Sequence, residues 1–560
     1  MPINSNSPSA GVYTARKDLS VGAFSLSTAV VGLVGMARKG PINQTVPVRN
    51  QDYLKTIFGA KDPKYGFGLY VAHPISKQTN ELFYVRLVNG AKYAVITMTV
   101  DDPTASIPQY RLTNYVDEDG NVVGINSPDE LGFLPNDPLN DNLVGYFLLE
   151  NPGSWNDEMS LRIRTNAPLG LDPYSNRSSY NDKLFNVDIY ENYQEGSQPS
   201  QTITVCLNQY QDDLNRQYEI EYALENESND LRFKKNPYFI RNNDPGFYVT
   251  DFCYFQGGDD GQKVTSDQIA KAYLEYYSDP EEIRVTLLVS GGHDDHVIHR
   301  AMQMAADQHI NCHAIMYAPR DVQTPSRYIR YRKQTLNLNA ANASLYAPDC
   351  RIFDEDTGRY LDFSGAGQIA AVYCYTDNNR GSWFAPAGIT ASQVLDIIGL
   401  TQKYDQDDRD ALTREQLCYI RKLPAKLGGG FAVWEANTLL NKDSAFQQIQ
   451  IQRMVGYVLE MAHKQCMVGL FDPNDSVLRE FLKGGTEKFL EEIKLARGLR
   501  GGESGSDGYQ VVCDETNNTA QTIQNGDLLM DIVLDPTRMT KRIIYRFILN
   551  PKGSRSTTLI

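Results

Sequence analysis

The feature that most constrains this chain is an apolar strand expected close to its last residue, over residues 542–550. The odd positions of this run are all apolar, and β-branched and aromatic residues dominate it, which is typical of a strand with one buried face. Its members are Arg542, Ile543, Ile544, Tyr545, Arg546, Phe547, Ile548, Leu549 and Asn550. The nearest possible partner, residues 528–534, is separated from it by a connection that is long for a tight hairpin.

Two kinds of partner are open to this terminal strand. An unpaired strand edge promotes association, so the strand must pair with a sheet. It can close a sheet in its own domain, or it can add to a sheet in a neighbouring copy of the chain. Strand pairing alone does not distinguish these two possibilities. We expect the strand to pair with a sheet in a neighbouring copy.

The composition narrows the function classes. A chain of 560 residues is too long for one hydrophobic core, so we expect three or four domains. Its net charge of −15 argues against nucleic-acid binding and against attraction to anionic lipid. The eight cysteines are scattered singly with no C-x-x-C pair, so we expect buried thiols in a reducing compartment. The N-terminus lacks a signal-peptide pattern and the apolar run 24–36 is too short for a membrane span, so we expect synthesis and folding in the cytoplasm.

The first half of the chain changes pattern twice. Residues 1–20 are a polar arm, and 21–95 are the first part of a core domain, with strands at 29–35, 46–50 and 82–88 and a helix at 51–59 that ends at a glycine. Between residues 101 and 158 the only basic residue is Arg111, and turn motifs separate short strands. We therefore expect 96–250 to be an acidic, β-rich insertion that protrudes from the core.

The second half has an α/β pattern followed by long helices. Residues 251–405 contain a strand at 284–290, a helix capped by Asp294 or Asp295, and a strand at 312–317, which together predict a parallel β-α-β unit. A further helix is expected at 367–375. Residues 406–530 form a C-terminal α+β domain with helices at 444–470 and 476–497, and 531–560 hold the terminal strand and arm. The fold class is thus α/β and α+β multidomain.

The strongest chemical signal is a histidine-rich run. Five of the seven histidines lie between His293 and His313, and His296 and His299 could share a metal with Asp294 or Asp295. His309 and His313 would lie about 20 Å away along the helix, so the set does not converge on one ion. We expect solvated histidines near a helix start, with a metal-dependent hydrolase using His296 and His299 as the alternative of another class.

Two other motifs have simpler interpretations. The run 257–261, Gly-Gly-Asp-Asp-Gly, lacks the lysine of a phosphate loop and the distal glutamate of a calcium loop, so we expect a turn before a helix capped by Thr265 or Ser266. No nucleophile, base and oxyanion hole come together in the pattern. The sequence therefore predicts no enzyme, no catalytic residue, no cofactor and no metal.

A series of motifs in fixed order gives a resemblance to a known family. They are Gly11-Val12-Tyr13, Ala29 to Gly35, Gly40-Pro41, Phe58-Gly59, Asn151 to Trp155, Gly257 to Gly261, Tyr375 to Asp377, Arg380 to Ala387, Phe431 to Thr438, Gln452-Arg453, Phe471 to Asn474, and Cys513 to Asn517. In this order the chain resembles the contractile tail sheath proteins of bacterial viruses, the myovirus-type phages. It departs from the family at residues 155–157, where Trp-Asn-Asp replaces the usual Trp-Gly-Asn.

The resemblance implies a fold and an assembly. The core would be a mixed α/β domain of subtilisin-like form without catalytic residues. The two chain ends would add strands to sheets of neighbouring subunits, through Gly11, Val12, Tyr13 and Thr14 at the start and residues 543–549 at the end. The C-terminal domain would face an inner tube through Arg479, Lys483, Lys488, Lys494 and Arg497, although interleaved glutamates make a solvated helix face an equal alternative.

The resemblance also implies the function. Copies would polymerise as stacked hexameric rings around a tail tube and contract to drive that tube through a host cell envelope for genome delivery. The partners would be other copies, the tail tube protein, and the baseplate and tail terminator proteins, with no direct nucleic acid and no membrane insertion. The protein would be part of a virion and assembled in the host bacterial cytoplasm, and a phage-derived, bacteriocin-like contractile particle is the alternative within the same class.

Overall fold

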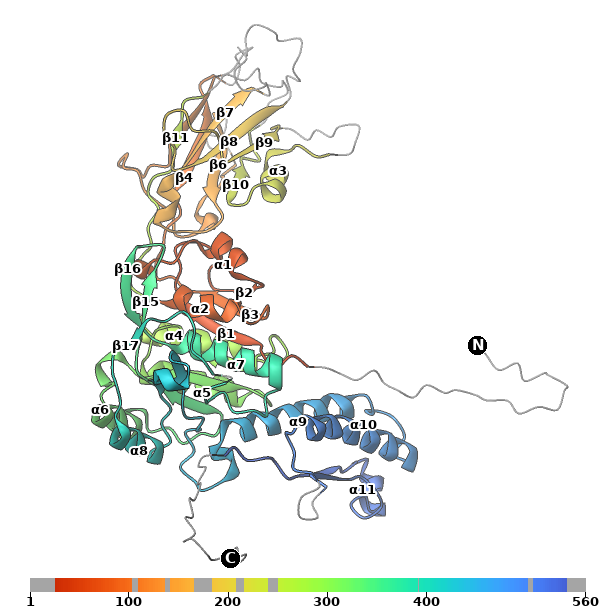
Figure 1. The fold of residues 1–560 in the computed structure, drawn as a ribbon. Coiled ribbons are helices and arrows are strands. Elements are labelled where there is room, and N and C mark those ends of the chain that lie inside the picture. Colours follow the sequence, from red (N-terminus) through yellow and green to blue (C-terminus); the bar gives the residue numbers. More distant parts are fainter. Residues whose placement is uncertain are drawn as a thin grey trace, which may run out of the picture.

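The computed structural model describes residues 26–102, 109–135, 142–165, 184–207, 216–239, 250–390, 392–501 and 507–540. The architecture is mixed α/β with several domains. Figure 1 shows a pair of antiparallel sheets at one end, a part with a parallel sheet and flanking helices in the middle, and a pair of long helices at the other end.

The middle part is built on a six-stranded sheet in the order β14-β13-β12-β1-β3-β2. All neighbouring pairs are parallel except β2 with β3. The strands are β1 (Val31–Gly35), β2 (Thr45–Val48), β3 (Leu82–Arg86), β12 (Leu287–Val289), β13 (His313–Tyr317) and β14 (Ala343–Tyr346). Every residue of β1, β12, β13 and β14 is buried, as expected for parallel strands covered on both faces.

Helices cover both faces of this sheet. Leu33 and Val289 face one apolar cluster, which also contains residues of α1 (Gln51–Phe58), α2 (Gly68–Ser76) and α7 (Ala366–Arg380). Val34 and Leu288 face a second cluster with α4 (Ser266–Tyr277) and α5 (His296–Asp307). The alternation of neighbouring residues between the two clusters follows from the period of two along a strand. The predicted β-α-β unit is confirmed, with Asp295 as the N-cap of α5.

The inserted sandwich consists of two antiparallel sheets, β10-β6-β4-β5 and β11-β7-β8-β9. Side chains from both sheets share one apolar core, which includes Ile96, Phe147, Leu161 and Val187. The elements are β4 (Val95–Val100), β5 (Tyr110–Asn114), β6 (Leu143–Leu149), β7 (Met159–Thr165), β8 (Phe185–Glu191), β9 (Gln201–Val205), α3 (Ile220–Glu227), β10 (Leu231–Lys235) and β11 (Cys253–Tyr254).

The C-terminal part centres on two long helices, α9 (Ile449–Met467) and α10 (Ser476–Leu495). They share an apolar cluster with a two-stranded sheet, β20 (Tyr509–Val512) and β21 (Asp531–Leu534). The remaining elements are α6 (Pro325–Arg330), β15 (Cys350–Asp354), β16 (Arg359–Phe363), β17 (Gly399–Leu400), α8 (Gln406–Arg414), β18 (Ile420–Lys422), β19 (Phe431–Val433) and α11 (Ala520–Asn525).

Several predicted boundaries need correction. The helix expected at 444–470 begins only at Ile449, because a 3₁₀ turn over Ala445–Gln447 precedes it. The helix expected at 367–375 extends to Arg380 and ends at Gly381, whose φ of 100° suits glycine. The strand expected at 528–534 forms only over Asp531–Leu534. The strand expected at 542–550 lies outside the described residues.

The cysteines and the helices show two further general properties of the chain. All eight cysteines are free, and seven of them are buried while Cys466 is half-buried, which confirms the expected buried thiols. Among the described residues, none of the helices has both the length and the apolar character needed to cross a bilayer.

Candidate functional site: assembly surfaces and the domain junction

The residues predicted to add strands to neighbouring copies, 11–14 and 543–549, lie outside the described part of the chain. A possible acceptor for such strands is within it. β20 and β21 pair with each other and with no third strand among those described. Val511 is buried in the cluster beneath α9 and α10, whereas Val533 remains 58% exposed. A two-stranded sheet has two open edges and gains stability from further strands, so this sheet is suited to strand addition.

The five basic residues predicted to face a tube lie on α10 or just after it. Lys488 and Arg497 are exposed, Lys483 and Lys494 are half-buried, and Arg479 is buried. The Arg479 guanidinium donates to Asn474 Oδ1 at 3.1 Å, and Lys494 Nζ lies 3.2 Å from Glu491 Oε2. The charges of Arg479 and Lys494 are therefore engaged within the molecule, and Lys483, Lys488 and Arg497 present the more accessible positive charge. The tube-facing role remains a prediction.

The histidine-rich run splits into two environments. His296 is the first residue of α5, and its side chain stays 42% exposed with Nδ1 2.9 Å from Asp295 Oδ1. His299, one turn later, is fully buried, and its Nδ1 lies 3.1 Å from the Tyr331 hydroxyl. The expectation of solvated histidines is thus wrong for His299, because the inward face of α5 carries it against Tyr331.

Burial also favours the uncharged forms of His299 and Asp294. It lowers the pKa of His299 to about 3 and raises the pKa of Asp294 to about 8, although the Ser290 hydroxyl donates to Asp294 Oδ1 at 2.7 Å. His299 Nε2 and Asp294 Oδ1 are 4.0 Å apart, so at neutral pH they form no ion pair. In the ranges that the structure describes, no group of three or more His, Cys, Asp or Glu side chains is placed to hold a metal ion.

The best-defined polar site is the junction between the middle part and the inserted sandwich. The chain crosses it twice, between β3 and β4 and between β11 and α4, and the two crossings pair with each other. Lys92 N donates to Asp259 O at 2.8 Å, and Gln262 N donates to Asn89 O at 2.7 Å. A 3₁₀ turn over Ser154–Glu158, between β6 and β7, returns from the sandwich to the same place.

Arg86, the last residue of β3, lies at the centre of this junction and is 1% exposed. Its guanidinium donates to four carbonyl oxygens: Ala37 at 2.9 Å, Gly40 at 2.7 Å, Arg38 at 3.2 Å, and Pro152 of the sandwich at 3.1 Å. Burial lowers the pKa of Arg86 to about 10, so the side chain keeps its charge at neutral pH. A single buried cation therefore connects the loop after β1 with the inserted sandwich.

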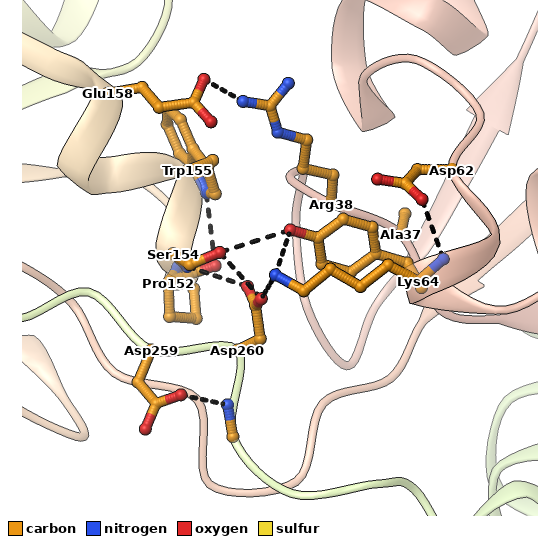
Figure 2. Close-up of polar contacts among 12 residues, drawn as sticks. Ala37, Arg38, Asp62, Lys64, Pro152, Ser154, Trp155, Glu158, Asp259 and Asp260 are labelled. Atoms are coloured by element: carbon orange, nitrogen blue, oxygen red, sulfur yellow. Dashed lines mark hydrogen bonds and ion pairs between the residues drawn. The ribbon is translucent and has the colours of Figure 1, made fainter. Parts of the chain in front are cut away.

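Asp260 provides a second connection, shown in Figure 2. Its carboxylate accepts from Ser154 N and Ser154 Oγ, both at 2.8 Å, and from Lys64 Nζ at 2.8 Å. Burial acts to raise the pKa of Asp260, but the hydrogen bonds from Lys64 and Ser154 outweigh it and leave the pKa below its usual value. The same figure shows Arg38 paired with Glu158. Asp260 thus joins one crossing, the returning turn and the middle part.

Three motifs that are far apart in the sequence meet at this junction. Gly40-Pro41 supplies a carbonyl to Arg86, Asn151 to Trp155 contains Pro152 and the start of the returning turn, and Gly257 to Gly261 contains Asp260. Sequence reasoning singled out each motif but missed their convergence, and it missed Arg86 altogether. A lone arginine at the end of an apolar strand, followed by a crossing into another domain, was the signal available for Arg86.

The chain has measurable similarity to known proteins. Over 314 residues it is 22% identical to the tail sheath protein of Enterobacteria phage T4, which covers 52% of this chain and 46% of that protein. Over 183 residues it is 27% identical to the tail sheath protein of Vibrio phage KVP40, which covers 33% of this chain and 26% of that protein. The chain is thus similar to two phage tail sheath proteins over part of its length. The matched stretches span about half of the first relative and about a quarter of the second.

The fold of this chain is similar to two solved structures. The sheath tail protein of Desulfitobacterium hafniense has a TM-score of 0.55 at 11% identity, with 90% of this chain and 93% of that chain covered. The sheath tail protein of Listeria innocua also has a TM-score of 0.55, at 10% identity, with 92% and 96% covered. Identities this low establish a shared fold alone. No protein-family model matches this chain.

Proposed function

We propose that this chain is the structural subunit of a contractile tail sheath. Copies polymerise as stacked hexameric rings around a tail tube and contract to drive the tube through a host cell envelope for genome delivery. The observation that carries the proposal is the 314-residue similarity to the tail sheath protein of Enterobacteria phage T4. The sheath of a phage-derived, bacteriocin-like injection particle is equally compatible with that similarity.

Assembly would proceed by strand addition. The N-terminal residues 11–14 and the C-terminal residues 543–549 of one copy add to sheets of neighbouring copies. The open edges of β20 and β21 support a role for this two-stranded sheet as the acceptor of such strands. Such contacts join different surfaces of the two partners, so they can continue from copy to copy and build rings stacked into a helix. Main-chain hydrogen bonds then keep subunits connected while their bodies move.

Contraction would be a release of stored free energy. The extended sheath is metastable behind a barrier, and the contracted form is lower in free energy. Release at the baseplate end propagates as rigid-body rotation of subunits, with the arms acting as hinges. The tail tube and tail terminator proteins are further partners. The accessible basic residues of α10 face the tube. The assembled protein is part of the virion.

The chain would act without catalysis. The relatives are sheath proteins, and the middle part, with helices on both faces of a parallel sheet, is compatible with a subtilisin-like domain that lacks catalytic residues. The competing hydrolase would need His299 as a ligand, yet its ring is buried beside Tyr331. The proposal therefore assigns no catalytic residue, cofactor or metal.

Electron microscopy of the purified full-length chain tests the proposal. A sheath subunit is expected to form hollow, transversely striated cylinders of uniform diameter, in the absence of nucleotide or metal. Treatment with mild denaturant is expected to convert long cylinders into shorter and wider ones. A protein that stays monomeric, or that forms only closed particles of fixed size, would contradict the proposal.

A further inference from the structure

We infer that the inserted sandwich and the middle part form one rigid body, and that Arg86 and Asp260 are the positioning residues that fix the angle between them. The inference goes beyond the proposed sheath function and does not depend on it. It starts from the number of connections. Two paired crossings and one returning turn meet within a single cluster, so the sandwich is held by contacts of the returning turn as well as by the two covalent crossings.

Arg86 contributes specificity of orientation. A guanidinium is planar and holds its N–H donors in a fixed fork, so it satisfies four carbonyls only in one arrangement of the groups that carry them. Three of these carbonyls belong to residues 37–40 and the fourth belongs to Pro152. A rotation of the sandwich would draw Pro152 O away and leave a buried N–H group without a partner, which is energetically costly.

Asp260 adds a second point of attachment, at the first residue of the returning turn. It receives both the amide and the hydroxyl of Ser154, so the start of the 3₁₀ turn is held by two hydrogen bonds. Lys64 reaches the same carboxylate from the short 3₁₀ helix Pro63–Tyr65 of the middle part. Figure 2 shows this carboxylate between Lys64 and Ser154, so it contacts both bodies. The Arg86 guanidinium also contacts both.

The backbone at the junction is also packed too closely to act as a hinge. A Cβ atom at Gly258 would lie 2.5 Å from Gly153 O, so only glycine allows the crossing and the returning turn to approach this closely. Gly257 beside it has φ of 97°, a conformation that favours glycine. These glycines bring the backbone of the crossing into direct contact with the backbone at the start of the returning turn. Backbone rotation at this point would break that contact, so the segment does not act as a hinge.

The consequence is mechanical. Any rotation of the middle part carries the sandwich through the same angle, so the sandwich moves as a rigid arm. Its outer end, far from the junction in Figure 1, is displaced the most. Flexible presentation of the sandwich is excluded by this arrangement.

Pulsed electron spin resonance on the full-length chain tests the inference. One nitroxide is placed at Glu225→Cys on α3 and the other at Lys271→Cys on α4, both exposed positions on opposite sides of the junction. The half-buried Cys466 is replaced by Ser, and the other seven cysteines are buried. Excess unlabelled protein separates labelled copies if the chain polymerises. The expected result is one narrow distance distribution for the parent and a broad one for Arg86→Met.

Matched variants complete the experiment. Arg232→Met removes a guanidinium that pairs with Glu150 inside the sandwich, and it is expected to leave the distribution narrow. If Arg86→Met does not fold, Lys64→Met combined with Asp260→Asn carries the same prediction of broadening without removing the buried cation. A broad distribution in the parent, or a narrow one in every folded junction variant, would overturn the inference. Failure of the protein to form cylinders would leave this result unaffected.

Discussion

Buried ionisable side chains are the most informative individual residues in this chain. His313 on β13 has Nε2 3.0 Å from Ser344 Oγ and Nδ1 3.3 Å from Gln452 Oε1, and its ring stacks on Tyr373. Burial, reinforced by the nearby positive charge of Arg453, lowers the pKa of His313 to about 3. The ring is therefore a neutral member of the core at physiological pH.

This burial predicts acid sensitivity. In the unfolded chain His313 is protonated near its ordinary pKa, whereas in the folded chain it stays neutral down to about pH 3. Above the ordinary pKa the neutral ring therefore costs the folded chain no stability. As the pH falls below that pKa, protons bind preferentially to the unfolded chain and the free energy of unfolding decreases. We expect His313 to account for about 2 kcal/mol of the stability lost between roughly pH 7 and pH 5. Urea denaturation of the parent and of His313→Gln at both pH values measures this, and equal losses in the two proteins would refute the assignment.

Sequence patterns do not reveal such burial at the residue scale. Histidines near a helix start were expected to be solvated, and His296 fits that expectation. His299 differs because its burial depends on Tyr331, which is distant in sequence and reaches α5 only through the tertiary fold. Arg86 was missed for a related reason, since its four partners are backbone carbonyls, which leave no trace in residue identity.

At the element scale, a buried ion pair fastens α9 to α7. Arg453 Nη1 lies 2.7 Å from Asp377 Oδ1 and Nη2 lies 2.5 Å from Asp377 Oδ2, with the two side chains 3% and 0% exposed. Arg453 also donates to Thr28 O at 3.2 Å, which attaches the segment before β1 to α9. The helix of the C-terminal part is therefore joined to the middle part by a bidentate contact.

Removing one partner of this pair should lower the free energy of unfolding far more than removing both partners. Arg453→Met leaves a buried carboxylate unpaired, and we expect it to lower the free energy of unfolding by about 3–5 kcal/mol. Adding Asp377→Leu should restore much of the loss. Arg351→Met, which breaks the exposed pair with Asp362, is the control and should leave stability nearly unchanged. Chemical denaturation checks all three, and a double variant no better than Arg453→Met would contradict this view of the pair.

Elements with a strong periodic pattern or a clear cap were predictable from sequence. The buried run at 29–35, the glycine-terminated helix at 51–59 and the Asp295-capped helix α5 were all found close to their predicted bounds. α2 was missed because it is buried on nearly every side and contains Pro74, so it has neither an amphipathic pattern nor an uninterrupted helical composition. Pairing between remote strands, such as β1 with β12, required the structure.

At the scale of the whole molecule, three joints hold the parts of the chain together. The middle part and the sandwich are held by Arg86 and Asp260, and the C-terminal helices are held by the Arg453–Asp377 pair. In the proposed assembly, movement between copies then comes from segments outside these joints. The proposed function assigns this movement to the residues predicted to pair with neighbouring copies, 11–14 and 543–549.

Negative-stain electron microscopy of two truncated chains tests this central claim most directly. One chain lacks residues 1–18 and the other lacks everything after Lys541. Each truncation removes one predicted strand while leaving the described body intact, so each chain is expected to remain folded and monomeric and to form no long cylinders. Long, regular cylinders assembled by either truncated chain would contradict the claim.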